Sequence, residues 1–531
     1  MRSDSNIFIR REKCHVCGIC VERCILDNLR MYLAPCRAAC PIHMNCQGYV
    51  RLIAQVKDEE AAKEMRKDLP FSGIAGRVCH HPCEESCERK KVDNGAVHIR
   101  ALKRYLADTF PEIACSPEPA AQRTGKKIAV VGSGPAGLMA AYELSRKGHG
   151  VTVFEAESEP GGMLRWAIPA FRLPSAEVSR AVGLLEKMGV VFRTGTTLGK
   201  ELDPEKLEKE MDAVFLAMGG GPGAALAIPG AEVEGVRLAL DQLRSAREGR
   251  PLPVGRSCIV IGGGNAAVDA ALLCRELGAE EVTVTCLEDR PHMPAFGGEI
   301  EDALQQGVTL RNGWGPRRIF RRDDGALRLE LSPCRRVFDD QGGFSPLLED
   351  FVGLSPTVDS VIIAAGQRPN LSLPQDLLAG AAGRVAADPL TLQTARPKVF
   401  AGGDAVFGRQ SVLQAMAQGR EAALSIDRFL QGERLRWGRV YGEGVCITDF
   451  PIDRSGAVAR PRKTLRREEI GSRARAEAEH GLSPAEAREE AERCLNCGRP
   501  GEVNQTCWYC LPCEIECPAE ALEVRLPYLV R

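Results

Sequence analysis

The strongest constraint on the fold is a βαβ unit in residues 127–155, which read KIAVVGSGPAGLMAAYELSRKGHGVTVFE. An apolar run at 128–131, a G-x-G-x-x-G turn, a helical stretch at 135–147 and a second apolar run ending in an acid form a dinucleotide-binding fingerprint. The glycines allow a tight turn and close approach to a pyrophosphate, and a helix N-terminus attracts phosphates. A glycine-rich turn in an unrelated α/β domain is the alternative. The candidate contacts are Gly132, Gly134, Pro135, Ala136, Gly137 and Glu155, the last as an acceptor for ribose hydroxyls.

A second unit of the same kind begins at Ser257 with SCIVIGGGNAAVD. After its apolar strand and glycines we expect a helix to about Leu277, a stop at Gly278 and a strand over 282–286. Ala267 takes the third glycine position, a variant that still lets helix and strand approach. Two such units in one chain indicate a flavin enzyme that also binds a nicotinamide nucleotide. The candidate contacts of this unit are Gly262, Gly263, Gly264 and Asn265.

Length and charge narrow the class further. The chain has 531 residues, enough for three or four domains, and a formal net charge of −1, so no basic field points to nucleic acid or to an anionic membrane. No stretch of about 18 apolar residues is present, and the first residues, MRSDSNIFIRREKC, hold no apolar signal core. We therefore expect a cytoplasmic protein with no membrane insertion and no nucleic-acid partner.

The 22 cysteines are an unusual number for such a chain. In a long chain without an export signal, metal ligation or redox chemistry is favoured over disulfides. Sixteen of the cysteines gather in two regions, 14–87 and 494–517. The other six stand singly, several within apolar patterns, and we expect them to be core residues. These six are Cys115, Cys258, Cys274, Cys286, Cys334 and Cys446.

Two cysteine runs have the spacing of a ferredoxin half-motif, in which three thiolates from one loop hold three irons of a cubane cluster. Pro518 follows the C-terminal run, as is usual, whereas Ile25 follows the N-terminal run. Since the fourth cysteine of such a motif often binds the other cluster, Cys24 and Cys517 could exchange to make one split two-cluster module. A zinc site is the alternative, although four cysteines so close together suit a cluster better. The two runs are Cys14, Cys17, Cys20 and Cys24, and Cys507, Cys510, Cys513 and Cys517.

A third group of cysteines lies in the segments PCRAACPIHMNC and GRVCHHPCEESC. Both segments resemble the N-terminal cluster domain shared by the glutamate synthase small subunit, the N-terminal half of dihydropyrimidine dehydrogenase and the large subunit of NADH-dependent ferredoxin:NADP oxidoreductases. The resemblance implies iron–sulfur ligands at Cys36, Cys40, Cys46, Cys79, Cys83 and Cys87.

This chain departs from that family pattern in its ligand set. It lacks a CxxC just upstream of the first segment, Lys103 stands roughly where some relatives have a Glu or Gln ligand, and Cys46 replaces a residue that tends to be aliphatic. A capping box at 483–486 starts a helix that delivers Cys494 and Cys497, and we hypothesise that these two fold back to complete the N-terminal domain. The alternatives are that they serve the adjoining ferredoxin-like run or form a redox dithiol. Sixteen ligands set a ceiling of four [4Fe-4S] clusters, and we expect three to four.

The remaining flavin contacts are implied by the same resemblance. In the relatives, segments equivalent to GGMLRWAIPAFRLP and VFAGGD lie along the flavin, and the helix after the second one points its N-terminus at the flavin ring. The segment VIIAAGQRPN is expected to return the chain to the flavin domain. The implied contacts are Gly162, Met163, Leu164, Gly366, Gly403, Asp404, Ser411 and Val412.

The choice of nicotinamide nucleotide can be predicted from charge. NADPH-using relatives carry arginines after the second strand of this unit, where this chain has Glu288. A carboxylate there can accept a hydrogen bond from a free ribose 2′-OH and would repel a 2′-phosphate. We therefore predict NADH over NADPH, although Arg290 remains nearby. The alternative is that Glu288 is a solvated loop acid.

Together these features predict an α/β fold with two Rossmann-like domains, one for FAD and one for NAD, preceded by an α-helical iron–sulfur domain and followed by a small ferredoxin-like iron–sulfur segment. The predicted boundaries are 1–34 for the N-terminal cluster motif, 35–125 for the helical domain, 126–225 and 358–430 for the FAD domain, 226–357 for the NAD(H) domain, 431–482 for a charged surface linker and 483–531 for the C-terminal segment.

The predicted function is electron transfer between NAD(H), FAD and [4Fe-4S] clusters, to or from a partner redox subunit or ferredoxin. This is an FAD-dependent NAD(P)H:acceptor oxidoreductase. Hydride transfer between stacked rings needs alignment rather than an acid or base, so no catalytic side chain is named. The alternatives are a reductase of the glutamate synthase small subunit type, a thiol reductase using Cys494 and Cys497, and an assembly module with structural clusters.

Overall fold

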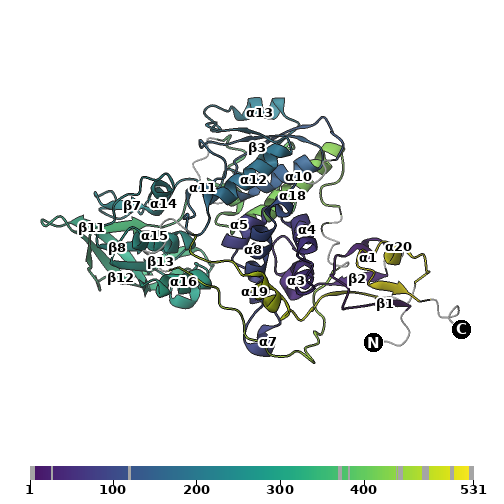
Figure 1. Ribbon diagram of the computed structural model, residues 1–531. Helices are drawn as coiled ribbons and strands as arrows, with labels where there is room; N and C mark the ends of the chain where they lie inside the picture. The colour runs from purple at the N-terminus through teal and green to yellow at the C-terminus, as the bar shows by residue number, and fades with distance from the viewer. Residues whose placement is uncertain are drawn as a thin grey trace.

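The computed structural model describes residues 6–24, 28–117, 121–368, 373–378, 380, 383–437, 439, 446–468, 477–502 and 507–525. In Figure 1 the second nucleotide unit lies at the left, and the first lies above a helical domain in the centre. A small module built from both ends of the chain lies at the right. We call these parts the NAD module, the flavin module, the helical domain and the terminal module.

The flavin module is built on a parallel sheet of order β16-β6-β3-β4-β5. The apolar run of the first fingerprint forms its central strand, where Ile128 to Val131 are buried and pair with the neighbouring strands on both sides. The strands are β3 (Lys127–Val131), β4 (Gly150–Phe154), β5 (Val191–Arg193), β6 (Ala213–Leu216) and β16 (Val399–Ala401). The helices are α10 (Pro135–Arg146), α11 (Met163–Trp166), α12 (Ser175–Lys187), α13 (Pro204–Glu210), α17 (Asp404–Phe407) and α18 (Val412–Gln431).

The NAD module combines a second parallel sheet, of order β10-β9-β8-β15-β7, with an antiparallel sheet formed by β11 to β14. Its strands are β7 (Val236–Leu238), β8 (Ser257–Ile261), β9 (Glu281–Cys286), β10 (Val308–Asn312), β11 (Trp314–Arg321), β12 (Leu327–Phe338), β13 (Phe344–Leu348), β14 (Thr357–Val358) and β15 (Ser360–Ile363). Its helices are α14 (Ala239–Arg247), α15 (Asn265–Glu276), the 3-10 helix η1 (Arg290–His292) and α16 (Gly297–Gln305).

One predicted domain boundary is wrong. Strand β15 was assigned by its sequence to the second part of the flavin domain, beginning at 358, but it pairs with β8 and β7 of the NAD module. The chain returns to the flavin module after this strand, where Gly223 and Gln367 form an isolated bridge. A buried apolar strand pairs equally well in either parallel sheet, so its sequence alone does not identify its sheet.

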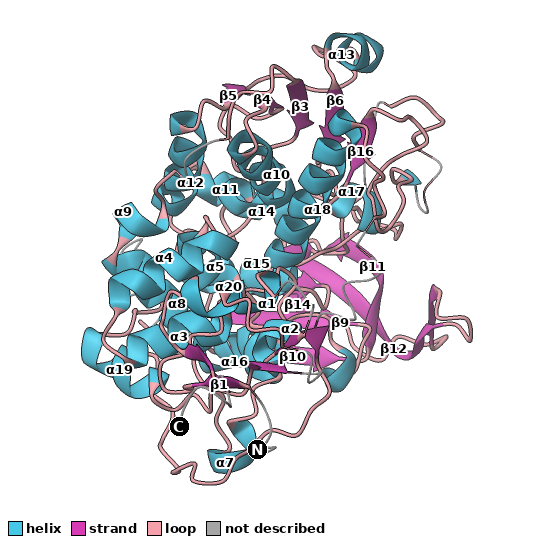
Figure 2. Ribbon diagram, turned by 90° about the vertical axis from the view of Figure 1, so that its right-hand side faces the viewer, coloured by secondary structure: helices cyan, strands magenta, loops and turns pink. Residues whose placement is uncertain are grey.

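The helical domain consists of short helices around a continuous apolar core that also reaches the flavin module. Figure 2 shows these helices stacked beneath α10, α12 and α18. They are α2 (Pro35–Ala38), α3 (Cys46–Ala54), α4 (Asp58–Asp68), α5 (Ser72–Val78), α6 (Pro82–Glu85), α7 (Lys90–Asp93), α8 (Ile99–Thr109) and α9 (Pro111–Ala114). Helix α19 (Pro484–Ala491) packs against α3 and α8, so the predicted segment 483–531 is divided between two modules.

The terminal module joins residues from the two ends of the chain. Strands β1 (Ile7–Ile9) and β19 (Leu522–Val524) pair antiparallel, and β2 (Leu29–Tyr32) lies between β17 (Cys446–Ile447) and β18 (Arg499–Glu502). The short helices α1 (Ile19–Glu22) and α20 (Pro512–Ile515) pack on each other, and all of these elements except β18 share one small apolar core. The N-terminal motif, predicted as a separate domain 1–34, is therefore one half of a shared module.

Two described parts of the predicted linker 431–482, namely 446–468 and 477–482, form a strap across the other modules. Most of its side chains are exposed, as predicted, but it also makes specific contacts. Arg462 pairs with Glu84 of the helical domain, and Arg467 pairs with Asp302 of the NAD module. The backbone N–H of Ala478 donates to the carbonyl of Phe171 in the flavin module at 2.8 Å. The strap therefore connects these three modules, and its first residues form β17 of the terminal module.

Of the six single cysteines, only half are core residues as predicted. Cys258, Cys274 and Cys286 are buried in the NAD module, where the first two sulfurs lie 3.6 Å apart. The remaining three are partly exposed: Cys115, Cys334 and Cys446.

Candidate functional site

The first glycine turn has the shape of a phosphate cradle. Gly132 adopts φ +102°, and a Cβ there would lie 2.3 Å from the carbonyl oxygen of Ala217, so only glycine fits. A Cβ on Gly134, in contrast, would meet nothing within 4 Å, which leaves open space at the start of α10. The first turn of α10 has no side-chain cap, so its backbone N–H groups are available for a phosphate. This geometry fits a bound dinucleotide.

Glu155 lies at the end of β4, beside this turn. Its carboxylate accepts hydrogen bonds from the backbone N–H groups of Ser133 at 3.0 Å and Glu157 at 2.9 Å, and the side chain is buried. These bonds hold the acid at the edge of the cradle. Its role as a ribose acceptor stays a prediction.

The predicted flavin contacts gather around the same turn. Gly162 lies directly against it, since a Cβ on Gly162 would be 2.8 Å from the Cα of Gly134. A Cβ on Gly403 would lie 3.4 Å from the Cβ of Ala136. Met163 is 42% exposed, whereas Leu164 is fully buried in the core. The role of Leu164 as a flavin contact stays a prediction, since no part of this residue is exposed.

Asp404 and the start of α18 are close neighbours of the cradle. Burial raises the pKa of Asp404 to about 6, and its carboxylate accepts from the backbone N–H of Gln410 at 3.1 Å. Ser411 caps α18 in a capping box with Gln414, and Val412 is the first residue of the helix. The Ser411 side chain is thus engaged by the helix it starts.

Sequence reasoning missed Gly419, which sets the contact between α18 and α10. A Cβ there would lie 2.2 Å from the carbonyl oxygen of Ala136, so a larger residue would push α18 away from the cradle. The small residue facing the first turn of a Rossmann helix is the signal that could have indicated this position.

The second glycine turn brings three predicted residues together. A Cβ on Gly263 would lie 2.8 Å from Oε2 of Glu288, so this carboxylate faces the turn. Asn265 Oδ1 accepts from the backbone N–H of Phe296 at 2.9 Å and holds the loop that follows β9. Gly366 adopts φ +96° with open space around it, at the crossing between the two nucleotide modules.

Arg409, which the sequence did not single out, reaches this second turn from the flavin module. Its Nη1 atom lies 3.1 Å from the position of a Cβ on Gly264, at the start of α15. A guanidinium beside a helix N-terminus adds to its attraction for a phosphate. Arg290, in contrast, pairs with Glu301 at 2.8 Å.

The terminal cysteines converge in two groups across the module. One cavity is lined by Cys14, Cys17, Cys20 and Cys517, three from the N-terminal run and one from the C-terminal run. Cys24 lies close enough to Cys507 and Cys513 for its charge to act on both of them. The structure therefore brings Cys24 and Cys517 to the opposite halves, as the exchange of fourth ligands requires.

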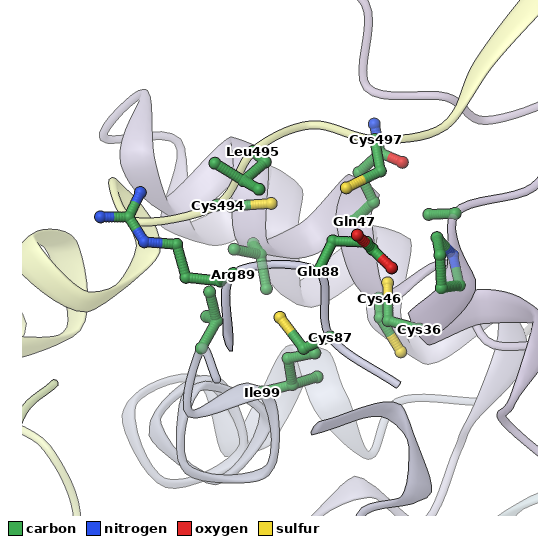
Figure 3. Close-up of a pocket in the computed structure, with 14 residues that line it drawn as sticks. Cys36, Cys46, Gln47, Cys87, Glu88, Arg89, Ile99, Cys494, Leu495 and Cys497 are labelled. Atoms are coloured by element: carbon green, nitrogen blue, oxygen red, sulfur yellow. The ribbon is translucent and has the colours of Figure 1, made fainter. Parts of the chain in front are cut away.

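A second cysteine-lined cavity lies in the helical domain. Cys494 and Cys497 fold back onto it, and their sulfurs border the same space as those of Cys36, Cys46 and Cys87 (Figure 3). The fold-back hypothesis thus agrees with the geometry of the chain, while ligation by these residues stays a prediction.

Arg493 anchors the loop that carries these two cysteines. It is 1% exposed, and its guanidinium pairs with Glu490 at 2.6 Å and with Asp93 at 3.0 Å. It also donates to the backbone carbonyls of Gly95 and Ala96. A fully buried charge that is satisfied in this way holds the loop in one position.

The cysteine groups fit iron–sulfur clusters better than single ions. Among the described residues, no three His, Cys, Asp or Glu side chains converge closely enough to hold one metal ion. Tetrahedral zinc needs its sulfurs about 2.3 Å from one centre, whereas a cubane places each thiolate on a different iron. Burial raises the pKa of Cys494 to about 11 and that of Cys497 to about 12, so cluster assembly must displace their protons.

Two nucleotide turns and two cysteine-lined cavities in one chain define a pyridine nucleotide-dependent flavoprotein with iron–sulfur centres. Comparison with known families agrees: the chain belongs to the pyridine nucleotide-disulphide oxidoreductase family, whose profile matches residues 126–419. A second profile, dihydropyrimidine dehydrogenase domain II, 4Fe-4S cluster, matches residues 13–114.

Three relatives are similar over most of the chain. The NADP(+)-dependent formate dehydrogenase subunit beta of Moorella thermoacetica is 33% identical over 88% of this chain and 71% of its own length. The NAD-dependent dihydropyrimidine dehydrogenase subunit PreT of Escherichia coli O157:H7 is 31% identical over 77% and 93%. The glutamate synthase [NADPH] small chain of Escherichia coli K12 is 30% identical over 75% and 88%.

These findings confirm the predicted family, fold class and enzyme class. The chain is an FAD-dependent NAD(P)H oxidoreductase with iron–sulfur centres and a role in electron transfer. Relatives of both nucleotide preferences are found, so similarity does not decide between NAD and NADP. No helix in the described part of the chain is long and apolar enough to cross a membrane.

Proposed function

We propose that this chain is the NADH-handling subunit of a larger cytoplasmic oxidoreductase, in which it moves electrons between NADH, FAD and [4Fe-4S] clusters. The observation that supports this most is the order of the modules. The NAD module lies at one side of the molecule and the terminal module at the other, and the flavin module and the helical domain, stacked on each other, lie between them (Figure 1). Such an order suits a path from a two-electron carrier, through a flavin, to one-electron centres.

The residues around the two turns would align the cofactors rather than donate or accept protons. FAD supplies the exchange between hydride and single-electron chemistry. Gly134 and α10 would bind its pyrophosphate, Gly162 and Gly403 would let the chain approach it closely, and Glu155 would accept from its ribose. The thiol-reductase alternative is disfavoured, because residues 126–225 and 358–430 contain no cysteine.

NADH is the nucleotide that the charges favour. Glu288 faces Gly263 in the turn, where it would accept from a ribose 2′-OH and repel a 2′-phosphate. Arg290, the nearby cation that could offset this, is paired with Glu301. Both observations support a preference for NADH.

The partner would be a redox subunit or a ferredoxin. Relatives are named as subunits of a formate dehydrogenase and a dihydropyrimidine dehydrogenase, which supports a role inside a complex. A reductase of the glutamate synthase small subunit type is the second candidate, since one relative is a glutamate synthase small chain. The paired cysteine runs of the terminal module favour the first candidate, because they add one-electron centres at one end of the molecule.

Anaerobic purification, with iron, zinc and flavin measured per chain, tests the proposal. We expect about 12 to 16 irons and one FAD per chain, reduced by NADH far more readily than by NADPH. Zinc in place of iron, or iron that NADH does not reduce, would refute it.

The nucleotide preference has its own test. Glu288→Gln should lower the ratio of kcat/KM for NADH to kcat/KM for NADPH about tenfold. This corresponds to a loss of about 1.4 kcal/mol in the discrimination between the two nucleotides. Glu281→Gln, an exposed acid at the other end of β9, is the matched control and should leave the ratio unchanged. An unchanged ratio in Glu288→Gln would show that this acid does not select the nucleotide.

A further inference from the structure

Apart from the single Cys115, the cysteines of the helical domain number eight once Cys494 and Cys497 are included, which is enough for two complete clusters. Four of the eight form one set by position. The cavity of Figure 3 is lined by all four: Cys36, Cys87, Cys494 and Cys497. Cys87 lies close enough to Cys494 and Cys497 for its charge to act on both of them.

Cys46 lies between this set and the remaining three cysteines. It borders the cavity, is 2% exposed, and its thiol interacts with those of Cys36, Cys40 and Cys83. Because the first set already holds four thiols, a fifth has no iron to bind there. Cys40, Cys79 and Cys83, on the other side, are one thiol short.

Lys103 marks the centre of this second group. It lies on α8, is 3% exposed, and within the described residues it makes neither a hydrogen bond nor an ion pair with a carboxylate. The groups that act on its charge are the sulfurs of four cysteines, which share one buried core: Cys79, Cys83, Cys40 and Cys46. A buried ammonium is costly unless an anion compensates it.

We infer that Cys40, Cys46, Cys79 and Cys83 hold a cluster of their own, and that Lys103 is the buried cation that compensates its charge. Cys46 thus supplies the fourth thiolate. This inference rests on the proposed function, because it assumes that the domain binds clusters.

The Lys103 ammonium has a redox consequence. With four thiolates, a [4Fe-4S] centre goes from a net charge of −2 to −3 when it accepts one electron, here delivered from NADH through the flavin. A buried cation stabilises the more negative state and raises the reduction potential. The other set also has cations nearby, since Arg51 and Arg89 act on Cys494, although Arg89 pairs with Asp93 at 2.6 Å. Lys103 is therefore expected to raise the potential of its own centre above the value that this centre would have without the cation.

Cys46→Ala tests the ligand set, with Cys115→Ala as the matched control from the same region. Anaerobically purified Cys46→Ala should contain about four irons fewer per chain than wild type and lose one EPR-active centre, yet keep one FAD. Cys115→Ala should match wild type. Wild-type iron and EPR spectra in Cys46→Ala would overturn the inference alone, whereas a wild-type protein without iron would overturn the proposed function.

Lys103→Met tests whether the Lys103 ammonium compensates the charge of the cluster. This test does not depend on whether Cys46→Ala folds. At a fixed potential, the ratio of reduced to oxidised iron in one centre should fall about tenfold, or about 59 mV for a one-electron couple. Iron and FAD content should not change. Lys91→Met, an exposed lysine of α7 in the same domain, should leave every potential as in wild type. Unchanged potentials in Lys103→Met would overturn this role.

Discussion

The nucleotide modules and the cluster modules are assembled from the chain in opposite ways. Each nucleotide turn lies within one βαβ unit, such as β3-α10-β4, so its parts are close in sequence. The cluster cavities draw on both ends of the chain, and Cys36 lies beside Cys494 while Cys14 lies beside Cys517. A βαβ unit forms its nucleotide site when the unit itself folds. A cysteine cavity built from distant segments forms only if other contacts hold those segments together.

The largest loss of stability is therefore expected when Arg493, which holds the C-terminal cysteine loop on the helical domain, is removed. Arg493→Ala would leave Glu490 buried without its cation and would remove one of the two arginines that pair with Asp93, at a cost of about 3–5 kcal/mol. We expect the loop of Cys494 and Cys497 to detach, about four irons per chain to be lost, and FAD to stay bound. Iron and FAD quantification measures this. The exposed Arg488→Ala on α19, the helix just before this loop, is the control, and equal loss of FAD would contradict the independence of the two regions.

The strap between the regions should respond to pH. Burial alone would raise the pKa of Glu479, but the guanidinium of Arg100 at 2.7 Å and other arginines hold it at about 2. Since the folded pKa lies below the ordinary value, this stabilisation, at most about 3 kcal/mol, is present above pH 4.5 and is lost as the pH falls toward 2.

Hydrogen-exchange protection of residues 460–468 and 477–482 measures this effect. In Glu479→Gln protection should fall at pH 7, and the difference from wild type should shrink as the pH is lowered below about 4.5. Glu489→Gln, an exposed acid paired with Lys463, should change protection by less than about 0.5 kcal/mol. A difference that does not vary with pH would rule out the charge of Glu479 as its cause.

On the flavin side, Gly419→Ala should disturb a nucleotide site without disturbing the clusters. The added methyl would meet the carbonyl of Ala136 and displace α18, at a cost of about 1–3 kcal/mol. FAD should bind about tenfold more weakly while iron content is unchanged. Gly183→Ala, which faces open space within α12, should instead stabilise by about 0.5–1 kcal/mol. Unchanged FAD affinity in Gly419→Ala would contradict the tight contact.

The smallest expected effect concerns the contact between the two nucleotide modules. Arg409→Ala removes a guanidinium next to Gly264, so KM for NADH should rise about fivefold while kcat and FAD content stay constant. The exposed Arg434→Ala is the control. A change in kcat alone would assign Arg409 to another step.

The same contrast explains what could be predicted from the sequence. The sequence predicts the helix ends of both fingerprint units to within one or two residues. This succeeds because all parts of such a unit follow one another directly in the sequence. The predicted domain of strand β15 is wrong. A strand buried on both faces is a continuous apolar run without alternating polar residues, so its sequence does not indicate which strand it pairs with. The cysteine runs were found easily, but their division into groups could not be predicted, because it depends on how α19 packs on α3 and α8.

The pairing of β1 with β19 has a consequence for how the protein is made. Residues 7–9 leave the ribosome first of the described strands, and their partners, residues 522–524, leave it last. At about 5–20 residues per second, Cys14 waits roughly 25 to 100 s for Cys517. During that interval its thiol can take up iron only without its full set of partners. The terminal module can therefore close only after residues 522–524 have left the ribosome, and iron held by thiolates of both runs would mark a chain synthesised beyond Cys517.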